Sequence, residues 1–244
     1  MVPTYFRRCS GIECFNGHCG FALLFFVAKF IAAASIVPAV ACFVTTIARR
    51  NSRMSATSKA ELRAAALARR DALSDEERAA AAVAVAKRGL PLEIKPGLVV
   101  SGYSPIRSEI DPIPLMRKIA EQGGRLALPA VMARGQSLTF RAWSPNDRMV
   151  MGPLGILEPS PAAAELMPDI MLVPLAAFDR LGHRIGYGAG HYDYTFAHLR
   201  KTKAVRGVGI AFAAQQIKAV PALAHDVALD YVLTETRTFD FRSS

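Results

Sequence analysis

The stretch from Ile170 to Asp193 limits the possible folds more than any other part of the sequence. It opens with an apolar run, Ile170–Ala177, which is short enough for a buried strand. Four glycines follow within nine residues: Gly182, Gly186, Gly188 and Gly190. A segment with helix-forming and aromatic residues, His191–Arg200, comes directly after them. Strand, glycine-rich loop and helix start, in this order, are typical of a phosphate-binding segment.

The residues of this loop suit an anion and a cation together. Glycine lets backbone N–H groups approach a phosphate, and the helix N-terminus adds partial positive charge. We expect Arg184 to lie inside the loop, within reach of a phosphate, and Asp193 to hold a divalent cation from the first helical turn. The loop has no Gly-Lys-Ser/Thr, and His191 stands where a dinucleotide motif has its third glycine. From spacing alone, a plain surface loop is an equal alternative.

The segments on either side predict a parallel sheet. Leu98–Tyr103 and Arg125–Pro129 are expected strands, joined by a helix that begins with Asp111 as N-cap and ends at Glu121. Further strands are expected at Leu138–Trp143 near the sheet edge, at Arg206–Phe212 and at Leu229–Thr234. We therefore predict an α/β fold: a three-layer, mostly parallel sheet with helices on both faces, in a Rossmann-like single domain.

Two capping boxes predict tandem helices before the first strand. Ser58-x-x-Glu61 starts a helix to about Leu73, and Ser74-x-x-Glu77 starts one that ends near Gly89. Lys59 and Arg63 lie four residues apart, on one face of the first helix. Cations at a helix N-terminus oppose the macrodipole unless an anion lies nearby. A solvated basic face is the alternative for these two residues.

Three other features bear on a binding site. Glu109 follows the first strand, at the sheet end where such folds bind ligands, although a loop carboxylate is more often solvated. Trp143 suits the core better than a ligand contact. The stretch 144–168, rich in Pro, Gly and Ala, could fold over a cleft. Asp226 either joins Asp193 at a metal or caps a turn.

Residues 1–53 differ from the rest of the chain. They hold all four cysteines and the apolar run Phe21–Ala48, which only Lys29 interrupts and which is long enough to span a bilayer. Three interpretations remain open: a mis-assigned start with Met54 as the true first residue, a membrane anchor, or an export signal cleaved near Cys42. The first is favoured because the composition changes abruptly at Met54. We accordingly divide the chain into an apolar extension, 1–53, and a catalytic domain, 54–244.

The net charge of +10 suggests an anionic partner. A non-catalytic module that binds RNA or another polyanion is one alternative, and a membrane-anchored protein with its body outside the cell is another. The body contains no cysteine, so it has no thiol chemistry. Its basic residues are evenly scattered without interleaved aromatics, which argues against nucleic-acid binding.

Six motifs in order, over residues 58–238, resemble the 5-formyltetrahydrofolate cyclo-ligase family, also called 5,10-methenyltetrahydrofolate synthetases. The segments that carry the resemblance are Lys59-Ala60-Glu61-Leu62-Arg63, Tyr103-Ser104-Pro105 with Glu109, Gly155-Ile156-x-Glu158-Pro159, Arg184 to Asp193, Gln215, and His225-Asp226. Departures from the family pattern are Ala189 in place of a basic residue, His191 in place of a tyrosine, and Tyr194 in place of an arginine.

The resemblance implies a set of site residues. For ATP it implies Lys59, Arg63, Arg184, Ile185, Gly186, Tyr187, Gly188, Ala189, Gly190, His191 and Tyr192. For the folate it implies Tyr103, Glu109, His191 and Tyr192. For Mg²⁺ it implies Asp193 and Asp226.

The resemblance also implies a reaction: a ligase that uses ATP and Mg²⁺ to convert 5-formyltetrahydrofolate to 5,10-methenyltetrahydrofolate through a phosphorylated formyl group. Phosphoryl transfer of this kind depends mainly on positioning and charge stabilisation. We expect a cytoplasmic monomer with these small-molecule partners and no nucleic acid. A membrane partner is expected only if residues 1–53 belong to the mature protein.

Overall fold

The computed structural model describes residues 58–133, 135–223 and 226–242. The chain divides into two units, residues 1–55 and 56–244, and everything described here belongs to the second. The expected anchor Phe21–Ala48, the cysteines and His225 lie outside the described residues. Within the described ranges, none of the helices has the length and apolar character that a bilayer crossing requires.

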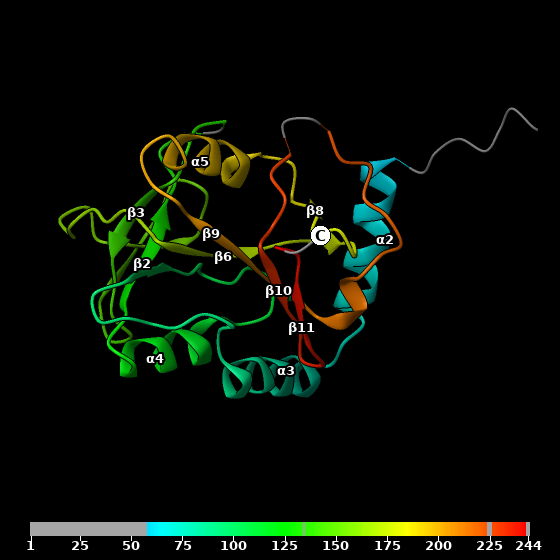
Figure 1. Ribbon diagram of the computed structural model, residues 1–244, viewed down its shortest axis with the longest axis horizontal. Helices are drawn as coiled ribbons and strands as arrows, with labels where there is room; N and C mark the ends of the chain where they lie inside the picture. The colour runs from blue at the N-terminus through cyan, green and yellow to red at the C-terminus, as the bar shows by residue number, and fades with distance from the viewer. Residues whose placement is uncertain (1–57, 134, 224–225, 243–244) are drawn as a thin grey trace, which may run out of the picture. The chain divides into compact units, whose positions relative to one another are not determined.

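A seven-stranded sheet forms the centre of this unit (Figure 1). Its order is β11 (Thr238–Asp240), β10 (Tyr231–Leu233), β9 (Arg206–Ile210), β6 (Ile170–Pro174), β1 (Val99–Ser101), β2 (Arg125–Ala130) and β3 (Thr139–Ala142). The five inner strands are parallel, and the edge strands β3 and β11 are antiparallel to their neighbours. The predicted parallel sheet is confirmed, including the edge position of the strand before Trp143.

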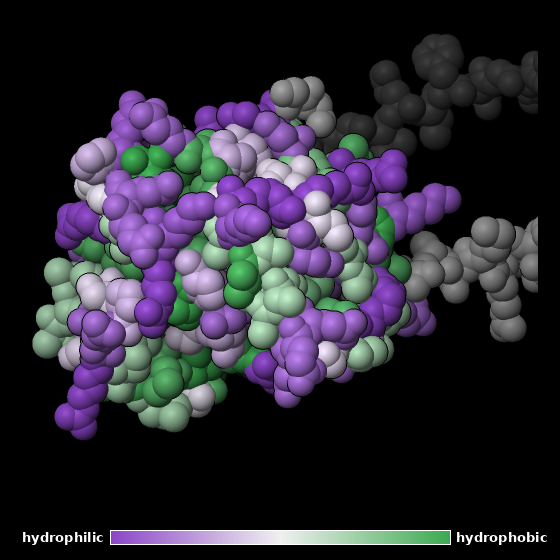
Figure 2. All heavy atoms as spheres, turned by 90° about the horizontal axis from the view of Figure 1, so that it is seen from below, coloured by the Kyte–Doolittle hydropathy of each residue, from purple (hydrophilic) through white to green (hydrophobic). Residues whose placement is uncertain are grey.

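Helices cover both faces, which confirms the predicted three layers. α3 (Asp75–Arg88) and α4 (Ile113–Glu121) pack on one face, where Val85, Leu115 and Met116 join Val100 and Leu172 in one core cluster. α5 (His191–Leu199) covers the other face, where Phe196 and Leu199 pack with Met171 and Val173 (Figure 1). Seen from the side of α3 and α4, hydrophilic residues dominate, with apolar residues in smaller areas between them (Figure 2). Trp143, 7% exposed, belongs to the core as expected.

The two tandem helices begin where the capping boxes place them. α2 (Lys59–Asp71) has Ser58 as N-cap, and α3 has Ser74; in both, the serine and the glutamate three residues on exchange the two expected hydrogen bonds. α4 begins one residue later than predicted, with Pro112 at the N-cap position. Asp111 nevertheless accepts a hydrogen bond from the Ile113 N–H at 2.9 Å, so its carboxylate still caps the helix.

The central stretch differs from the prediction in one important respect. The predicted strand Ile170–Ala177 is wrong at its end, because β6 stops at Pro174 and a separate hairpin follows, β7 (Ala177–Phe178) with β8 (Arg184–Ile185). Asp179 closes the hairpin: its Oδ1 accepts the N–H groups of Leu181 at 2.9 Å and His183 at 3.1 Å. Gly182, at φ +81, completes the turn.

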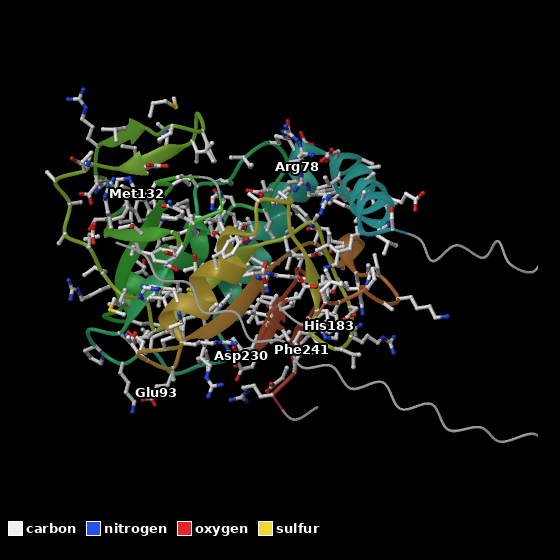
Figure 3. All side chains as sticks on the ribbon, turned by 90° about the horizontal axis from the view of Figure 1, so that it is seen from above. Arg78, Glu93, Met132, His183, Asp230 and Phe241 are labelled. Carbon is white, nitrogen blue, oxygen red and sulfur yellow. The ribbon has the colours of Figure 1, made fainter. Side chains whose placement is uncertain are left out.

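The Gly182 turn packs against the end of the chain. A Cβ on Gly182 would lie 2.9 Å from the Leu229 carbonyl oxygen and from the Phe241 ring, so only glycine fits. His183 and Phe241 accordingly lie close together in Figure 3. Arg184 and Ile185 are therefore strand residues, and the glycine-rich loop proper is Gly186–Gly190. The expectation that Arg184 lies inside the loop is wrong.

Two further antiparallel pairings were not predicted. β4 (Met149–Met151) and β5 (Leu157–Pro159) form a hairpin within the stretch that was expected to fold over a cleft. β11 adds an antiparallel strand after β10.

Candidate active site

A cavity of about 240 Å³ lies at the carboxyl ends of the central strands. Tyr103 and Ser104, which follow β1, line it together with Pro174 at the end of β6. β1 and β6 are neighbours in the sheet. From β1 the chain continues to β2 on one side, and from β6 it continues to β9 on the opposite side, so the strand order changes direction between β1 and β6. Open α/β sheets bind ligands at such a switch point, outside the carboxyl ends of the strands.

Several further segments contribute to the walls of the cavity. Pro129 and Val131 extend from β2, and the glycine-rich loop with the start of α5 supplies Gly186 to Asp193 except Gly188. The β4–β5 hairpin supplies Leu154 and Ile156 to Glu158, so part of the stretch 144–168, which was expected to fold over a cleft, lines the cavity. Met132, one residue beyond Val131, is 61% exposed (Figure 3).

The four residues predicted for the folate all line this cavity: Tyr103, Glu109, His191 and Tyr192. The Tyr103 hydroxyl donates to the Ile110 carbonyl oxygen at 2.7 Å, so Tyr103 offers mainly its ring to the cavity. His191 Nδ1 lies 3.0 Å from the Gln136 carbonyl oxygen, while its buried Nε2 has no hydrogen-bond partner among the described residues. With Nδ1 donating to the carbonyl, Nε2 is the acceptor nitrogen.

Glu109 is a carboxylate in a partly buried setting. Its Oε2 accepts the Ile106 N–H at 2.9 Å. Burial raises the pKa of the carboxyl group above the ordinary 4.5; the Ile106 N–H, a hydrogen bond from Tyr187 and the charge of Arg70 oppose that rise. Burial is also the main cause of the raised pKa of Tyr187 and Tyr192, and the Glu109 charge adds to both. These tyrosines therefore stay protonated and can donate hydrogen bonds.

The glycine-rich loop opens toward the cavity. Gly188 has φ +103 and Gly190 has φ +71, in the region of backbone conformation that favours glycine. A Cβ on Gly186 would meet no heavy atom within 4 Å, and one on Gly188 would meet only Arg63, at 4.0 Å. Gly190 is the N-cap of α5, and no side chain caps that helix end. The first N–H groups of such a helix are open to an anion.

The helix α2 brings two predicted cations to this loop. Arg63 Nε donates to the Gly186 carbonyl oxygen at 2.7 Å. Lys59 Nζ pairs with Asp226 Oδ2 at 2.5 Å. Neither cation lines the cavity itself, so α2 places them along its margin.

Arg184 and Asp193 form an ion pair in the cavity wall. Arg184 Nη2 lies 2.7 Å from Asp193 Oδ1, and Arg184 Nη1 donates to the Val227 carbonyl oxygen. The Val227 N–H also donates to Asp193 Oδ1, at 3.2 Å. Burial lowers the pKa of Arg184, although the charge of Asp193 opposes this. Since Asp226 directly precedes Val227, the structure brings both predicted metal ligands to one place.

No group of three His, Cys, Asp or Glu side chains suited to a metal occurs in the part of the chain that the structure describes. Two carboxylates are nevertheless the usual protein share of a magnesium site that a nucleotide completes. Asp193 uses only Oδ1 in the hydrogen bonds described above. The oxygen donors present therefore fit Mg²⁺ bound together with phosphate oxygens.

Two charged residues near the cavity were not predicted as site residues. Glu158, on β5, is 5% exposed, lines the cavity, and accepts the Val131 N–H at 3.0 Å. The sequence signal for it was the Gly155-Ile156-x-Glu158-Pro159 segment. Arg70, on α2, is 2% exposed and bonds to Tyr187. No sequence signal distinguished Arg70 from other helix arginines.

Comparison with known proteins gives a consistent result. The model of the 5-formyltetrahydrofolate cyclo-ligase family matches residues 55–235. A protein of Mycolicibacterium smegmatis named 5-formyltetrahydrofolate cyclo-ligase is 34% identical over 194 residues, 75% of this chain and 97% of the relative.

Solved structures agree in fold. The NMR structure of Aquifex aeolicus 5,10-methenyltetrahydrofolate synthetase is 32% identical and superposes with a TM-score of 0.64, over 76% of this chain and 94% of that one. A 5,10-methenyltetrahydrofolate synthetase from Mycoplasma pneumoniae, 21% identical, shares the fold with a TM-score of 0.57, over 73% of this chain and 99% of that one. With its family match, its relatives and its fold in agreement, the chain belongs to the 5-formyltetrahydrofolate cyclo-ligase family.

Proposed function

We propose that this chain converts 5-formyltetrahydrofolate to 5,10-methenyltetrahydrofolate, with hydrolysis of ATP to ADP and phosphate and with Mg²⁺ required. One observation carries the proposal beyond family membership. A single cavity margin combines a glycine loop at a helix N-terminus, cations from α2 and two acids, beside a pocket that contains Glu109. This arrangement suits a nucleotide and a flat second substrate that bind side by side and touch each other.

The nucleotide side rests on Lys59, Arg63 and the loop Gly186–Gly190. The two α2 cations lie at the loop, and open backbone amides complete a cradle for the triphosphate. In this proposal, Lys59 exchanges its partner Asp226 for a phosphate oxygen when ATP and Mg²⁺ bind. Asp193 and Asp226 would then hold the ion. Mg²⁺, when bound, supplies positive charge that neutralises the phosphate oxygens.

The reaction begins at the formyl group of the folate. The formyl oxygen attacks the γ-phosphorus, the bond to the β,γ-bridging oxygen breaks, and ADP leaves. This converts a poor leaving group into a phosphate on an iminium-like carbon. The folate nitrogen N10 then attacks that carbon and loses its proton, and inorganic phosphate leaves as the new C–N bond closes the ring.

This chain contributes position and charge to these steps. The loop amides, Lys59 and Arg63 hold the phosphates in line with the formyl oxygen. Glu109 accepts hydrogen bonds from N–H groups of the pterin, and the rings of Tyr103 and Tyr192 flank it in the cavity. No covalent link between protein and substrate is required.

A coupled absorbance assay tests the proposal. The purified full chain, given 5-formyltetrahydrofolate, ATP and Mg²⁺, should accumulate the methenyl chromophore and release one ADP per product. Reactions without ATP, or with EDTA in place of Mg²⁺, are the matched controls and should give no product. Absence of product at high enzyme concentration, with both substrates and Mg²⁺ present, would reject the assignment.

The metal ligands have a separate prediction. Asp226→Asn removes a negative charge from the expected Mg²⁺ site while keeping an oxygen that can accept the Leu223 N–H, which now lies 2.7 Å away. We expect the Mg²⁺ concentration for half-maximal rate to rise about tenfold or more, with little change in the KM for the folate. Magnesium titrations of both proteins at saturating ATP measure this. An unchanged magnesium dependence would place the ion elsewhere.

We also propose that the enzyme acts as a cytoplasmic monomer. All the site residues named above come from one chain, so the site needs no partner copy. Size-exclusion chromatography with light scattering, together with cell fractionation, tests both points. A stable oligomer or membrane-bound activity would contradict the proposal.

A further inference from the structure

Arg70 is a buried charge that the proposed reaction leaves without a role. It lies in the last turn of α2, and its side chain is 2% exposed. A buried guanidinium is costly unless its donors are used. Its acidic partner is the adjacent Asp71, whose Oδ1 lies 3.2 Å from Nε and whose side chain is 56% exposed. A largely solvated carboxylate does not by itself explain why Arg70 is buried.

The remaining bonds of Arg70 lead to the cavity wall. Its Nη1 donates to the Tyr187 hydroxyl at 2.6 Å, and its Cζ lies 5.8 Å from the centre of the Tyr187 ring. Its Nε also donates to Ser108 Oγ at 3.0 Å. Tyr187 belongs to the glycine-rich loop, and Ser108 precedes Glu109. One guanidinium therefore ties the glycine-rich loop to the loop that carries Glu109.

The loop after β1 requires stabilising contacts of this kind. Arg107 has φ +55, a left-handed conformation that is unfavourable for a residue with a side chain and persists only where the surroundings hold it. The Ile106 N–H bond to Glu109 holds this turn from within. The bond from Arg70 to Ser108 holds it from α2.

Tyr187 links Arg70 to Glu109. The Tyr187 hydroxyl accepts a hydrogen bond from Arg70 and lies 3.4 Å from the Leu175 carbonyl oxygen, and its interaction with the Glu109 carboxylate opposes the rise in the pKa of Glu109 that burial causes. Tyr187 is 37% exposed, but its hydroxyl is held by the hydrogen bond from Arg70. The other groups that face Glu109 are Arg107, Tyr103 and Tyr192.

We propose that Arg70 is a positioning residue: its planar fork fixes the Tyr187 hydroxyl and Ser108 and so holds the Glu109 carboxylate toward the substrate. The inference rests on the proposed function, since it assumes that Glu109 contacts the folate. Arg70 itself does not touch the substrate. It acts on two features of Glu109, the direction of the carboxylate and its charge.

Two substitutions at position 70 separate geometry from charge. Arg70→Met removes both, and we expect kcat/KM for the folate to fall about tenfold to a hundredfold, the size of effect seen when a charged hydrogen bond is lost. In a plot of kcat/KM for the folate against pH, the fall in rate on the acidic side (the acid limb) should move to higher pH, because loss of a nearby positive charge raises the pKa of Glu109 further. Arg70→Lys keeps the charge without the fork, so kcat/KM should fall while the acid limb stays near its wild-type position.

Milder variants keep the test decisive if a position-70 variant fails to fold. Tyr187→Phe removes only the hydroxyl and should move the acid limb in the same direction as Arg70→Met. Ser108→Ala should lower kcat/KM for the folate without moving the limb. The matched control is Arg69→Met, in the same turn of α2, where the guanidinium bonds, within the described part of the chain, only to the backbone carbonyls of Ala214 and Ala65. It should match wild type in both measurements.

The experiment uses the full chain, with folded state monitored by thermal unfolding. KM for ATP should change by less than about threefold in the variants at positions 69, 70 and 108, because Arg70 bonds to the Tyr187 hydroxyl and to Ser108, and not to Lys59, Arg63 or the backbone amides of the glycine-rich loop. Wild-type-like kcat/KM in folded Arg70→Met and Tyr187→Phe would overturn the inference. So would equal losses for ATP and folate with an unmoved acid limb, which would mean a structural role only. Wild-type turnover is the separate measurement that decides the proposed function.

Discussion

Glu109 shows how one residue can serve binding at the expense of stability. Its folded-state pKa is raised above the ordinary 4.5, chiefly by burial. A carboxyl group whose pKa is raised on folding contributes its full stabilisation at pH values below its pKa in the unfolded chain. That contribution is lost as the pH rises through its higher pKa in the folded protein. At neutral pH the ionised carboxylate therefore costs stability, while the proposed folate contact needs that same ionised form.

Glu109→Gln should separate the two effects. We expect the variant to be more stable relative to wild type at about pH 8 than at about pH 5, since only the wild type carries a buried charge at the higher pH. Its kcat/KM for the folate should be lower, and the acid limb that Glu109 causes in the wild type should be absent. Thermal unfolding at both pH values and pH–rate profiles check this. A stability difference that is the same at both pH values would contradict it.

The β7–β8 hairpin is the element that places the loop, and Asp179 holds it closed. Its carboxylate, 2% exposed, accepts the N–H groups of Leu181, His183 and, at 2.9 Å, Val220. Asp179→Ala would leave these backbone donors without their acceptor. We expect a loss of about 2–4 kcal/mol in the free energy of unfolding and a raised KM for ATP.

The matched control for the hairpin is Asp147→Ala. Asp147 also accepts a backbone N–H, from Ser144 at 2.7 Å, but in an exposed turn away from the cavity. It should cost less than about 1 kcal/mol, because water replaces an exposed acceptor. Denaturant unfolding of both variants provides the comparison. Equal losses in the two variants would argue against a special role for the buried turn.

The elements that sequence predicted well are those whose signals are local. Ser58 and Ser74 form capping boxes with partners three residues away, and both helices begin there. The hairpin was hidden because Ala177 and Phe178 continue the apolar run of β6, and burial gives strand and hairpin the same pattern. Its turn depends on Asp179 reaching Val220, 41 residues on, which no local pattern contains.

The residues of the candidate site also fall into two groups, those that sequence motifs predicted and those that only the three-dimensional contacts show. The glycine-rich loop, Glu109 and the two acids were placed from motifs in the sequence, and the structure gathers them. Arg70 was missed because an arginine in an amphipathic helix is normally solvated, and its partners Ser108 and Tyr187 lie 38 and 117 residues away. Such a residue becomes visible only when its burial and contacts are known.

At the scale of the whole molecule, residues 54–244 should suffice for catalysis. The family model begins at residue 55, and the described site residues all lie from Lys59 onward. We expect a chain that starts at Met54 to keep kcat/KM within about twofold of the full-length protein. Purification and assay of both proteins measure this, and N-terminal sequencing of natively expressed protein shows which form the cell makes. An inactive 54–244 chain would assign residues 1–53 a necessary role.

The contacts of α2 also set an order of events during synthesis. This helix leaves the ribosome first among the described elements, yet Arg63 and Arg70 close on Gly186 and Tyr187, more than a hundred residues later. Until that part of the chain emerges, the helix has no loop to hold. Because such distant pairings form slowly, the catalytic pocket should be among the last regions to mature, and a nascent chain stalled before residue 186 should remain unable to bind nucleotide.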